Sequence, residues 1–299
     1  MKIIKKFTAL VAAFMLLTSC RSASVNDSGI NIVASFYPIY LIAENVIGNT
    51  DVISLSSMAG PQTGCLHDYQ LTAGDMERLE RADVFIINGG GMESFLDNAI
   101  NIYPSLNVID SSLNVMCLHE HEDHEFHAGH DHGENSHYWI LPQNAVIQAW
   151  NICDELSLIY PQMADEFSKN TREFERSINS IDSLDCGGIK ACVFSEAFEY
   201  LSPAFNIDVE ACIDMDESHS PSAKELANII DLVNEEKISL LIASDDASKS
   251  IADVISAETD ASVIVLDPIL GGDFSPEGYV SAMSENVRIL KGCVENERS

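Results

Sequence analysis

Short runs of aliphatic and β-branched residues alternate along the chain with longer segments in which apolar residues keep a helical spacing. In the first half, the runs that predict strands are Asn31 to Ala34, Val52 to Leu55, Val84 to Ile87 and Asn107 to Ile109. The second half repeats the pattern, and its predicted strands are Ala191 to Phe194, Ile207 to Ile213, Ser239 to Ala243 and Val263 to Leu266. Because strands alternate with helices, the sequence predicts an α/β protein of two doubly wound, (βα)4-like lobes.

Start signals support the helices of this pattern. Pro38 stands where the first turn of a helix would begin, and its fixed φ suits that position. The spacings Thr72-x-x-Asp75 and Ser222-x-x-Glu225 are typical of capping boxes, in which each side chain bonds the backbone amide of the other residue. These signals predict helices after the first, second and sixth strands.

The region from residue 143 to residue 184 carries no strand signal, and its apolar residues keep helical spacing. Pro161 is placed to start a second segment within it. We therefore expect a long linking helix over 143–184, between an N-terminal lobe at 30–142 and a C-terminal lobe at 185–299. The ligand site is expected in the cleft between the lobes.

The first twenty residues have the pattern of a bacterial lipoprotein signal. Three lysines precede an apolar run that is too short to span a membrane, and Leu17-Thr-Ser-Cys20 resembles a lipobox. We expect removal of residues 1–19, a lipid on Cys20 and a polar tether over residues 20–29; an uncleaved anchor helix is the alternative. The mature chain is expected outside the cytoplasm, lipid-anchored to the cell membrane of a bacterium.

Acidic residues dominate the charge of the chain. Its 299 residues include 47 acids and 16 bases, for a formal net charge of −31, and loss of the three signal lysines would make it −34. A polyanion of this size repels phosphate backbones, so nucleic acid is not an expected partner and cations are the more natural ligands. The content of hydrophobic residues, 46%, excludes a wholly disordered chain.

Seven cysteines remain after Cys20, and no CxxC pair occurs among them. The sequence therefore supports neither a zinc ribbon nor a thioredoxin-like redox site. Their scattered positions favour free thiols, and a disulfide between Cys186 and Cys192, which flank a Gly-Gly turn, is the alternative.

Side chains that bind metals follow several predicted strands. Ligands of open α/β sheets bind beyond the carboxyl ends of the strands, which here lead to His67, His137 and Asp267. Imidazole and carboxylate together suit zinc, and also manganese or iron. The sequence therefore predicts a metal site at this edge.

Six segments also carry a resemblance to a known family, although no single one would suffice. They are Ile32-Val-Ala-Ser-Phe-Tyr-Pro38, His67-Asp-Tyr-Gln-Leu-Thr72, residues 82–93, Ser136-His-Tyr-Trp139, Pro221-Ser-Ala-Lys-Glu-Leu226 and Val265-Leu-Asp-Pro268. Through them, residues 31 to 292 resemble the metal-specific solute-binding lipoproteins of bacterial ABC importers, the zinc and manganese receptors with the TroA-like fold. The resemblance implies a monomeric receptor that binds one metal ion between its lobes and delivers it to a permease with its ATPase.

The resemblance also implies the ligands. In the family, a histidine of the first loop, a histidine just after the His-rich insertion and the aspartate of the Leu-Asp-Pro segment bind the metal; these correspond to His67, His137 and Asp267.

A third His or Glu of the family pattern falls on Ser195, which is a poor zinc ligand. Glu196, His219 or a water molecule would complete the site, and we favour Glu196 because it adjoins the required position.

Residues 117–134 contain six of the nine histidines, interleaved with acids. With few aliphatic residues, this segment cannot build a core, and we expect a mobile loop that captures metal weakly. In the resembling family such loops mark zinc receptors rather than manganese ones, and imidazole-rich donors agree with that preference. The expected transported ligand is Zn2+, with Mn2+ as the alternative.

Enzymatic motifs are missing from the sequence. HExxH, GxSxG and GxxxxGK[ST] do not occur, and Gly89-Gly-Gly91 lacks the spacing of a dinucleotide-binding turn. We therefore expect a zinc receptor of an ABC importer rather than an enzyme. The alternatives are a manganese or iron receptor, an adhesin or zinc-buffering lipoprotein of the same fold, and a zinc-dependent hydrolase, whose site also uses histidines, a carboxylate and water.

Overall fold

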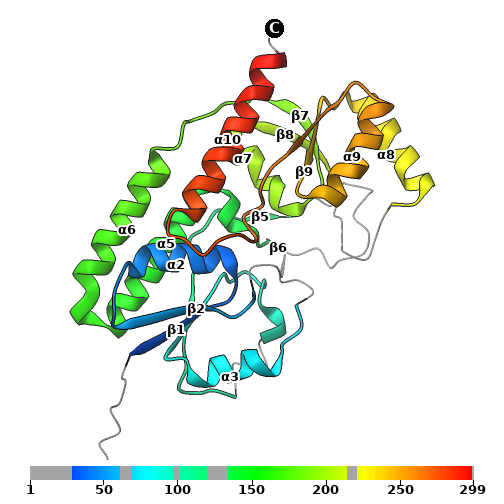
Figure 1. Cartoon of the computed structure of the whole chain (residues 1–299). Coiled ribbons are helices and arrows are strands. Elements are labelled where there is room, and N and C mark those ends of the chain that lie inside the picture. The colour runs from blue at the N-terminus through cyan, green and yellow to red at the C-terminus, as the bar shows by residue number, and fades with distance from the viewer. Residues whose placement is uncertain (1–28, 61–68, 97–101, 120–133, 214–220, 298–299) are drawn as a thin grey trace, which may run out of the picture.

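The computed structural model describes residues 29–60, 69–96, 102–119, 134–213 and 221–297 of the chain. Two parallel sheets of four strands lie at opposite ends of the molecule, with a layer of helices between them (Figure 1). Each sheet is the centre of one lobe. The predicted α/β class and the two-lobe architecture are confirmed.

The sheet of the N-terminal lobe has the strand order β2-β1-β3-β4, and its pairings are parallel. The inner strand β1 (Ile30–Ala34) is buried on both faces, because Ile32 packs into one core cluster and Val33 into another. A strand that is buried on both faces has a nearly continuous run of apolar residues, which is why this strand could be predicted from the sequence. The strands are β1 (Ile30–Ala34), β2 (Ile53–Ser57), β3 (Val84–Ile87) and β4 (Asn107–Asp110).

The sheet of the C-terminal lobe has the order β10-β9-β7-β8, also with parallel pairings. Leu240 and Leu241 enter different core clusters, so this sheet too is covered on both faces. Each strand begins and ends within a few residues of the predicted run. The strands are β7 (Ile189–Val193), β8 (Ile207–Cys212), β9 (Leu240–Ala243) and β10 (Ser262–Val265).

Both predicted capping boxes are present. Thr72 caps α3 (Ala73–Arg81), and Ser222 caps α8 (Ala223–Glu236), each with reciprocal bonds to the acid three residues later. Pro38 lies in the first turn of α2 (Tyr37–Ile47), as predicted. In the part of the lobes that the structure describes, the remaining helices are η1 (Ser94–Leu96), η2 (Tyr138–Ile140), η4 (Glu196–Tyr200), α7 (Leu201–Phe205), α9 (Asp246–Ala257) and α10 (Gly278–Glu297).

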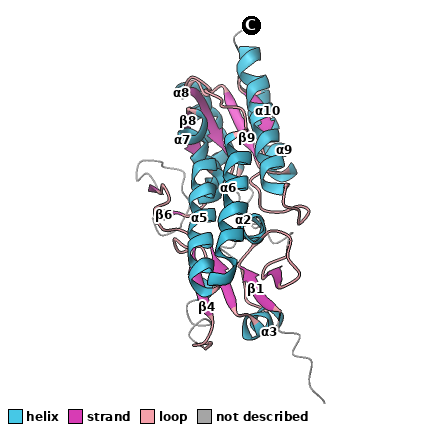
Figure 2. Cartoon of the chain, turned by 90° about the vertical axis from the view of Figure 1, so that its left-hand side faces the viewer, coloured by secondary structure: helices cyan, strands magenta, loops and turns pink. Residues whose placement is uncertain are grey.

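The linking region was expected to be a long helix over 143–184, with a second segment starting at Pro161. It forms two helices, α5 (Pro142–Ile159) and α6 (Ala164–Asn179), separated by the short turn η3 (Pro161–Met163). Pro161 lacks an amide hydrogen and clashes with a continuing helix, so α5 ends before it. Helices α5 and α6 pack against each other and against α2, along the long axis of the molecule (Figure 2).

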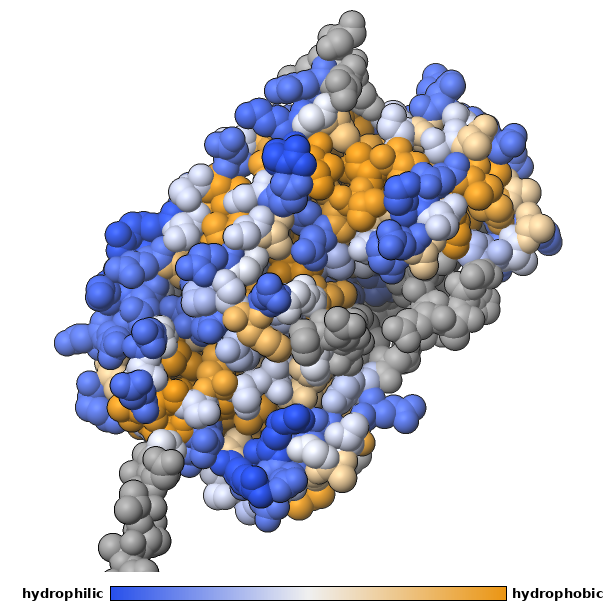
Figure 3. All heavy atoms as spheres, in the orientation of Figure 1, coloured by the Kyte–Doolittle hydropathy of each residue, from blue (hydrophilic) through white to orange (hydrophobic). Residues whose placement is uncertain are grey.

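The two lobes share one core. Buried residues of both sheets, of α2, α5 and α6, and of α10 belong to the same hydrophobic cluster. The outer face over α6 is mainly hydrophilic, whereas its inner face buries Phe167, Phe174 and Ile178 (Figure 3). Among the described helices, none has the length and apolar character needed to cross a membrane.

A two-stranded ribbon frames the His-rich segment. Strand β5 (Leu118–His119) pairs antiparallel with β6 (Glu134–Asn135), with His119 opposite Glu134. The sequence did not predict this ribbon, because two-residue strands carry no recognisable periodicity. Residues 120–133 lie outside the described part of the chain.

None of the six cysteines in the described segments forms a disulfide. Cys186 and Cys192 lie in different core clusters, and the alternative pairing between them is not formed in this structure. The other described cysteines are Cys117, Cys153, Cys212 and Cys293.

Candidate metal site

His137 lies directly after β6, where the chain enters η2, and only 4% of its surface is exposed. Its Nδ1 is 2.9 Å from Oδ1 of Asn135, and its backbone amide donates to the same oxygen over 3.1 Å. Since an amide oxygen only accepts, this contact places the proton on Nδ1 of His137, and in the neutral imidazole Nε2 then carries the lone pair. This is the tautomer in which Nε2 can bind a metal ion.

The other end of the Asn135 side chain contacts the C-terminal lobe. Its Nδ2 donates to the carbonyl oxygen of Glu196 and to Oε2 of Glu199, each over 2.9 Å. The hydroxyl of Tyr200 donates to the backbone carbonyl of Asn135 over 2.6 Å. The turn that follows β7 is therefore held against the segment that carries His137.

Asp267 follows β10 in the C-terminal lobe. Its Oδ1 accepts a bond of 2.7 Å from the amide of Ile269, and Asn286 on α10 bonds both its backbone amide and its carbonyl over 2.8 Å. Surrounding protein raises the pKa of the Asp267 carboxyl, and the bond from Ile269 opposes that rise. Asp267 is nevertheless exposed to solvent, so a cation can reach this carboxylate. A bound cation would offset the hydration that the carboxylate loses to the surrounding protein.

Trp139 joins the segments that carry His137 and Asp267. Its Nε1 donates to the carbonyl oxygen of Pro268 over 2.9 Å. The hydroxyl of Tyr279, on α10, donates to the backbone carbonyl of Trp139 over 2.6 Å. The centroid of the Trp139 ring system lies 5.2 Å from that of His137. Hydrogen bonds thus connect the His137 segment to two parts of the C-terminal lobe: through Asn135 to the turn after β7, and through Trp139 to the segment after β10.

The N-terminal lobe supports the same segment from behind. Asn88 donates from Nδ2 to the carbonyl of Ser136 over 2.9 Å, and Glu93 accepts from the amides of Asn88 and Gly89. Burial raises the pKa of Glu93 to about 7, against the effect of those two bonds. Gly90 has φ 63°, and a Cβ there would lie 1.9 Å from the Tyr138 hydroxyl oxygen, so only glycine fits.

Ser195 and Glu196 lie where β7 gives way to η4, and both are half-buried. Their position beside the Asn135 contact brings this strand end next to His137. Asp245, another acid that follows a predicted strand, instead caps α9 by accepting from the Ser248 amide over 2.7 Å. It has a structural partner within its own helix.

Two of the predicted ligands cannot be placed. His67 and His219 lie outside the described residues, as do five histidines of the His-rich segment, His121, His124, His127, His130 and His132. Within the described ranges, no group of three His, Cys, Asp or Glu side chains is arranged to hold a metal. The five-residue ligand assignment therefore stays a prediction, of which the structure describes His137, Glu196 and Asp267.

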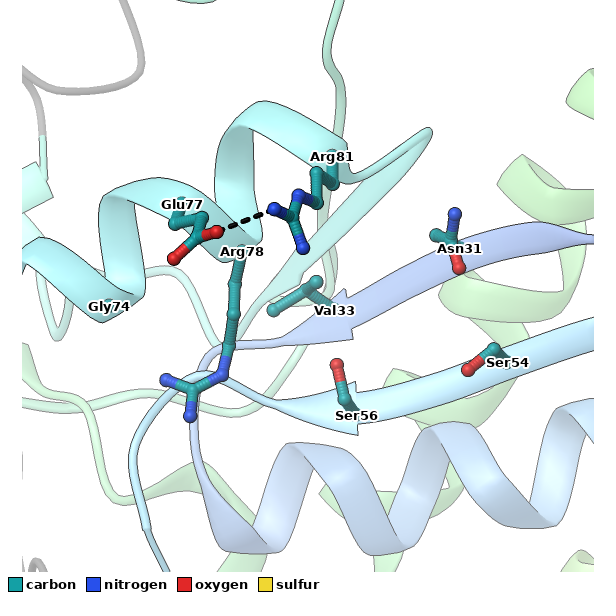
Figure 4. Close-up of a pocket in the computed structure, with 8 residues that line it drawn as sticks. All are labelled: Asn31, Val33, Ser54, Ser56, Gly74, Glu77, Arg78 and Arg81. Atoms are coloured by element: carbon teal, nitrogen blue, oxygen red, sulfur yellow. Dashed lines mark hydrogen bonds and ion pairs between the residues drawn. The ribbon is translucent and has the colours of Figure 1, made fainter.

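Two cavities bear on the candidate site, one beside Asp267 and one in the N-terminal lobe away from it. One of about 350 Å3 is bordered by Asp267, Tyr37 and the loop from Gly271 to Ser275. The other, of about 310 Å3, lies between α3 and the β1–β2 edge of the N-terminal sheet (Figure 4). Its lining includes a single carboxylate, Glu77, which pairs with Arg81, so the cavity offers no set of metal ligands.

Asn135, Tyr200 and Asn286 were not found from the sequence. Asn135 stands two residues before His137, which is a weak signal by itself, because its partners on the C-terminal lobe come about sixty positions later. Tyr200 and Asn286 stand in ordinary helical segments. Only the packing of distant strand ends shows their roles.

Solved structures with this fold include proteins that were crystallised with a bound metal ion. The manganese complex of the solute-binding protein FpvC from Pseudomonas aeruginosa superposes with a TM-score of 0.78 at 20% identity, covering 90% of this chain and 99% of that one. The zinc-bound ZnuA-like domain of Streptococcus pneumoniae AdcA gives a TM-score of 0.72 at 24% identity, covering 89% and 98%. At these identities the likeness shows the fold alone.

Sequence relatives extend over nearly the whole chain. The zinc-binding lipoprotein AdcA of S. pneumoniae is 27% identical over 98% of this chain, which spans only 62% of that protein's length. The high-affinity zinc uptake system protein ZnuA of Bacillus subtilis is 24% identical, covering 96% of this chain and 97% of its own. Residues 32–293 match the family described as zinc-uptake complex component A, periplasmic. The chain belongs to this family of zinc-uptake receptor components.

Proposed function

We propose that this chain is an extracytoplasmic receptor that binds Zn2+ between its lobes and delivers it to the permease of an ABC importer. Family membership over residues 32–293 supports this, as does the B. subtilis relative, named for high-affinity zinc uptake, which matches from end to end. In this role Zn2+ is cargo. The protein holds the ion and releases it, with no reaction of its own.

The observation that carries the proposal is the setting of His137. Its buried imidazole has Nδ1 fixed by Asn135, so that Nε2 carries the lone pair, at the junction of the His137 turn with two C-terminal strand ends. The proposed ligands are His67, His137 and Asp267. Glu196 is the preferred fourth donor and His219 the alternative, which together give the four-coordination that zinc favours.

The proposal includes the setting of the receptor in the cell. A lipid on Cys20 would hold the protein at the outer face of the cell membrane, where a permease and its ATPase receive the ion. We propose that it acts as a monomer. Mn2+ is the alternative cargo.

The experiment that tests the function is competition with a chelator for one equivalent of Zn2+. We expect His67→Ala and His137→Ala each to weaken binding at least about 100-fold, because a ligand contributes more than the 10- to 100-fold of an outer-shell partner. His130→Ala, in the His-rich segment, is the matched control and should leave the tight site unchanged. Unchanged affinity in both ligand variants would reject the site.

The identity of the cargo needs a separate measurement. Anomalous scattering at the zinc and manganese edges, from protein purified without added metal, should show one zinc ion. Manganese at the same position would replace the proposed cargo and leave the site assignment intact.

A further inference from the structure

One amide side chain spans the junction between the two halves of the candidate site. Asn135 is 2% exposed and lies on β6, between His137 and the turn after β7. Four hydrogen bonds use its side chain: two arrive at Oδ1 from His137, and two leave Nδ2 for the 196–199 segment. With both hydrogens of Nδ2 engaged, the amide is fixed in one orientation.

The orientation has a chemical consequence for His137. Carboxylates and carbonyls that accept from the second nitrogen of a metal-binding imidazole fix its tautomer and raise its basicity. Here a neutral amide takes that place, and the Glu199 carboxylate lies behind it, 2.9 Å from Nδ2. The negative charge polarises the amide, and through it the imidazole, without standing directly against the ring.

The same amide also fixes a distance between the lobes. Its bond to the Glu196 carbonyl holds the backbone beside Ser195 and Glu196, where the missing family ligand is expected. Reorientation of the amide would loosen His137 and this turn together. The Tyr200 hydroxyl, which donates to the Asn135 carbonyl, restrains the backbone of β6 at that position.

We propose that Asn135 is a positioning residue that presents Nε2 of His137 to the metal and sets the spacing between His137 and the 195–196 segment. The inference rests on the proposed zinc site, and it adds a residue outside the ligand set. Asn135 does not touch the ion. It transmits the charge of Glu199 to one ligand and the position of the C-terminal lobe to the site.

The first test combines zinc affinity with the tautomer of His137 in the metal-free protein. We expect Asn135→Ala to weaken zinc binding about 10- to 100-fold, the range for outer-shell partners. Nitrogen-15 NMR of labelled histidine, with the His137 signals assigned by their loss in His137→Gln, should show Nδ1–H in the wild type. In Asn135→Ala both ring nitrogens should move to intermediate shifts.

The matched control is Asn45, whose Nδ2 also donates to two carbonyls, those of Leu41 and Pro276, but away from the site. Asn45→Ala should change neither the affinity nor the tautomer. Equal losses of affinity in both asparagine variants, or an unchanged tautomer in Asn135→Ala, would overturn the proposal. Wild-type protein without zinc affinity would reject the proposed function, while the tautomer would still decide the role of Asn135.

A pair of exchanges tests the contact with Glu199 without relying on one variant. Asn135→Asp keeps an acceptor for His137 but places two carboxylates together, so we expect weaker zinc binding. Adding Glu199→Gln restores a hydrogen bond of reversed direction and should recover at least about fivefold. Glu199→Gln alone keeps an acceptor but removes the charge, so we expect it to weaken zinc binding about threefold, less than Asn135→Asp does. A double variant no tighter than Asn135→Asp would overturn the role of this contact.

Discussion

Ser195 stands where the resembling family carries a histidine or a glutamate, directly after β7, and its side chain is half-buried. A hydroxyl is a poor zinc ligand, so the proposed site lacks one donor at this position. Glu196 is the first residue of η4, and its backbone carbonyl accepts a hydrogen bond from the side chain of Asn135. We expect a small change at this strand end to turn its carboxylate toward the proposed site.

At the level of single residues, we therefore expect Glu196→Gln to weaken zinc binding more than His219→Ala, about tenfold against less than threefold. Ser195→His should tighten binding by restoring the donor of the family. Titration calorimetry on the three variants measures this. If neither loss matters while Ser195→His tightens binding, water completes the site and the hydrolase alternative needs an assay with an activated ester.

Sequence pattern was sufficient for some of these residues and not for others. His137 and Asp267 were selected because they follow predicted strands, and the structure brings their segments together through Trp139 and Pro268. Asn135 could not be selected in the same way. Its function depends on which strand ends meet, and that is decided by packing across the lobes.

Among the elements, the inner strands β1, β3, β7 and β9 were predictable because they are largely buried and leave apolar runs in the sequence. The division of the linker into α5 and α6 was only partly predictable. Pro161 marks the boundary. The packing of α6 against α5 and α2 depends instead on the burial of Phe167 and Phe174. Tyr200 accepts from the amide of Leu118 in β5, and Asn144 bonds Met116, two residues before β5, so side chains outside the ribbon stabilise it.

The two capping boxes allow a quantitative comparison at this scale. Thr72 donates from Oγ1 to Oδ2 of Asp75, whose side chain is almost fully buried, whereas Ser222 and Glu225 are exposed. Burial would raise the pKa of Asp75, but the bonds from Thr72 and Tyr69 and the charge of Arg78 lower it. Loss of the Thr72 hydroxyl leaves a buried carboxylate with one donor fewer.

We expect Thr72→Ala to lower the free energy of unfolding by about 2 kcal/mol and Ser222→Ala by about 1 kcal/mol or less. Urea unfolding followed by circular dichroism measures both. Thr72→Ser keeps the hydroxyl and is the control for the first variant. A larger loss for Ser222→Ala would contradict the reasoning from burial.

At the scale of the whole molecule, the ribbon of β5 and β6 frames the His-rich segment at its two ends. His119 pairs with Glu134, so the chain on either side of residues 120–133 is already held together. Expected weak capture of metal by this segment is therefore separable from tight binding at His137.

We expect replacement of residues 120–133 by the dipeptide Asn-Gly, which suits a two-residue hairpin turn, to remove weak, multiple zinc binding. The tight site should keep its affinity within about threefold, because a flexible run of imidazoles raises local metal concentration without adding a closed coordination geometry. Equilibrium dialysis over a range of zinc concentrations counts both classes of site. Loss of the tight site would show that the segment supplies a ligand.

The contact between the two ends of the described chain bears on how the protein reaches this fold. Helix α10 packs against α2, and the Tyr37 hydroxyl donates to the carbonyl of Asp273, 236 positions later. Part of the apolar surface of α2 thus stays uncovered until the last residues are available. Contacts of such long separation form late, so a chain emerging from its N-terminus cannot complete the first lobe on its own. During synthesis or export, the incomplete chain is prone to aggregation. The yield of folded protein then depends on chaperones that hold the chain unfolded, and not on each lobe folding in turn.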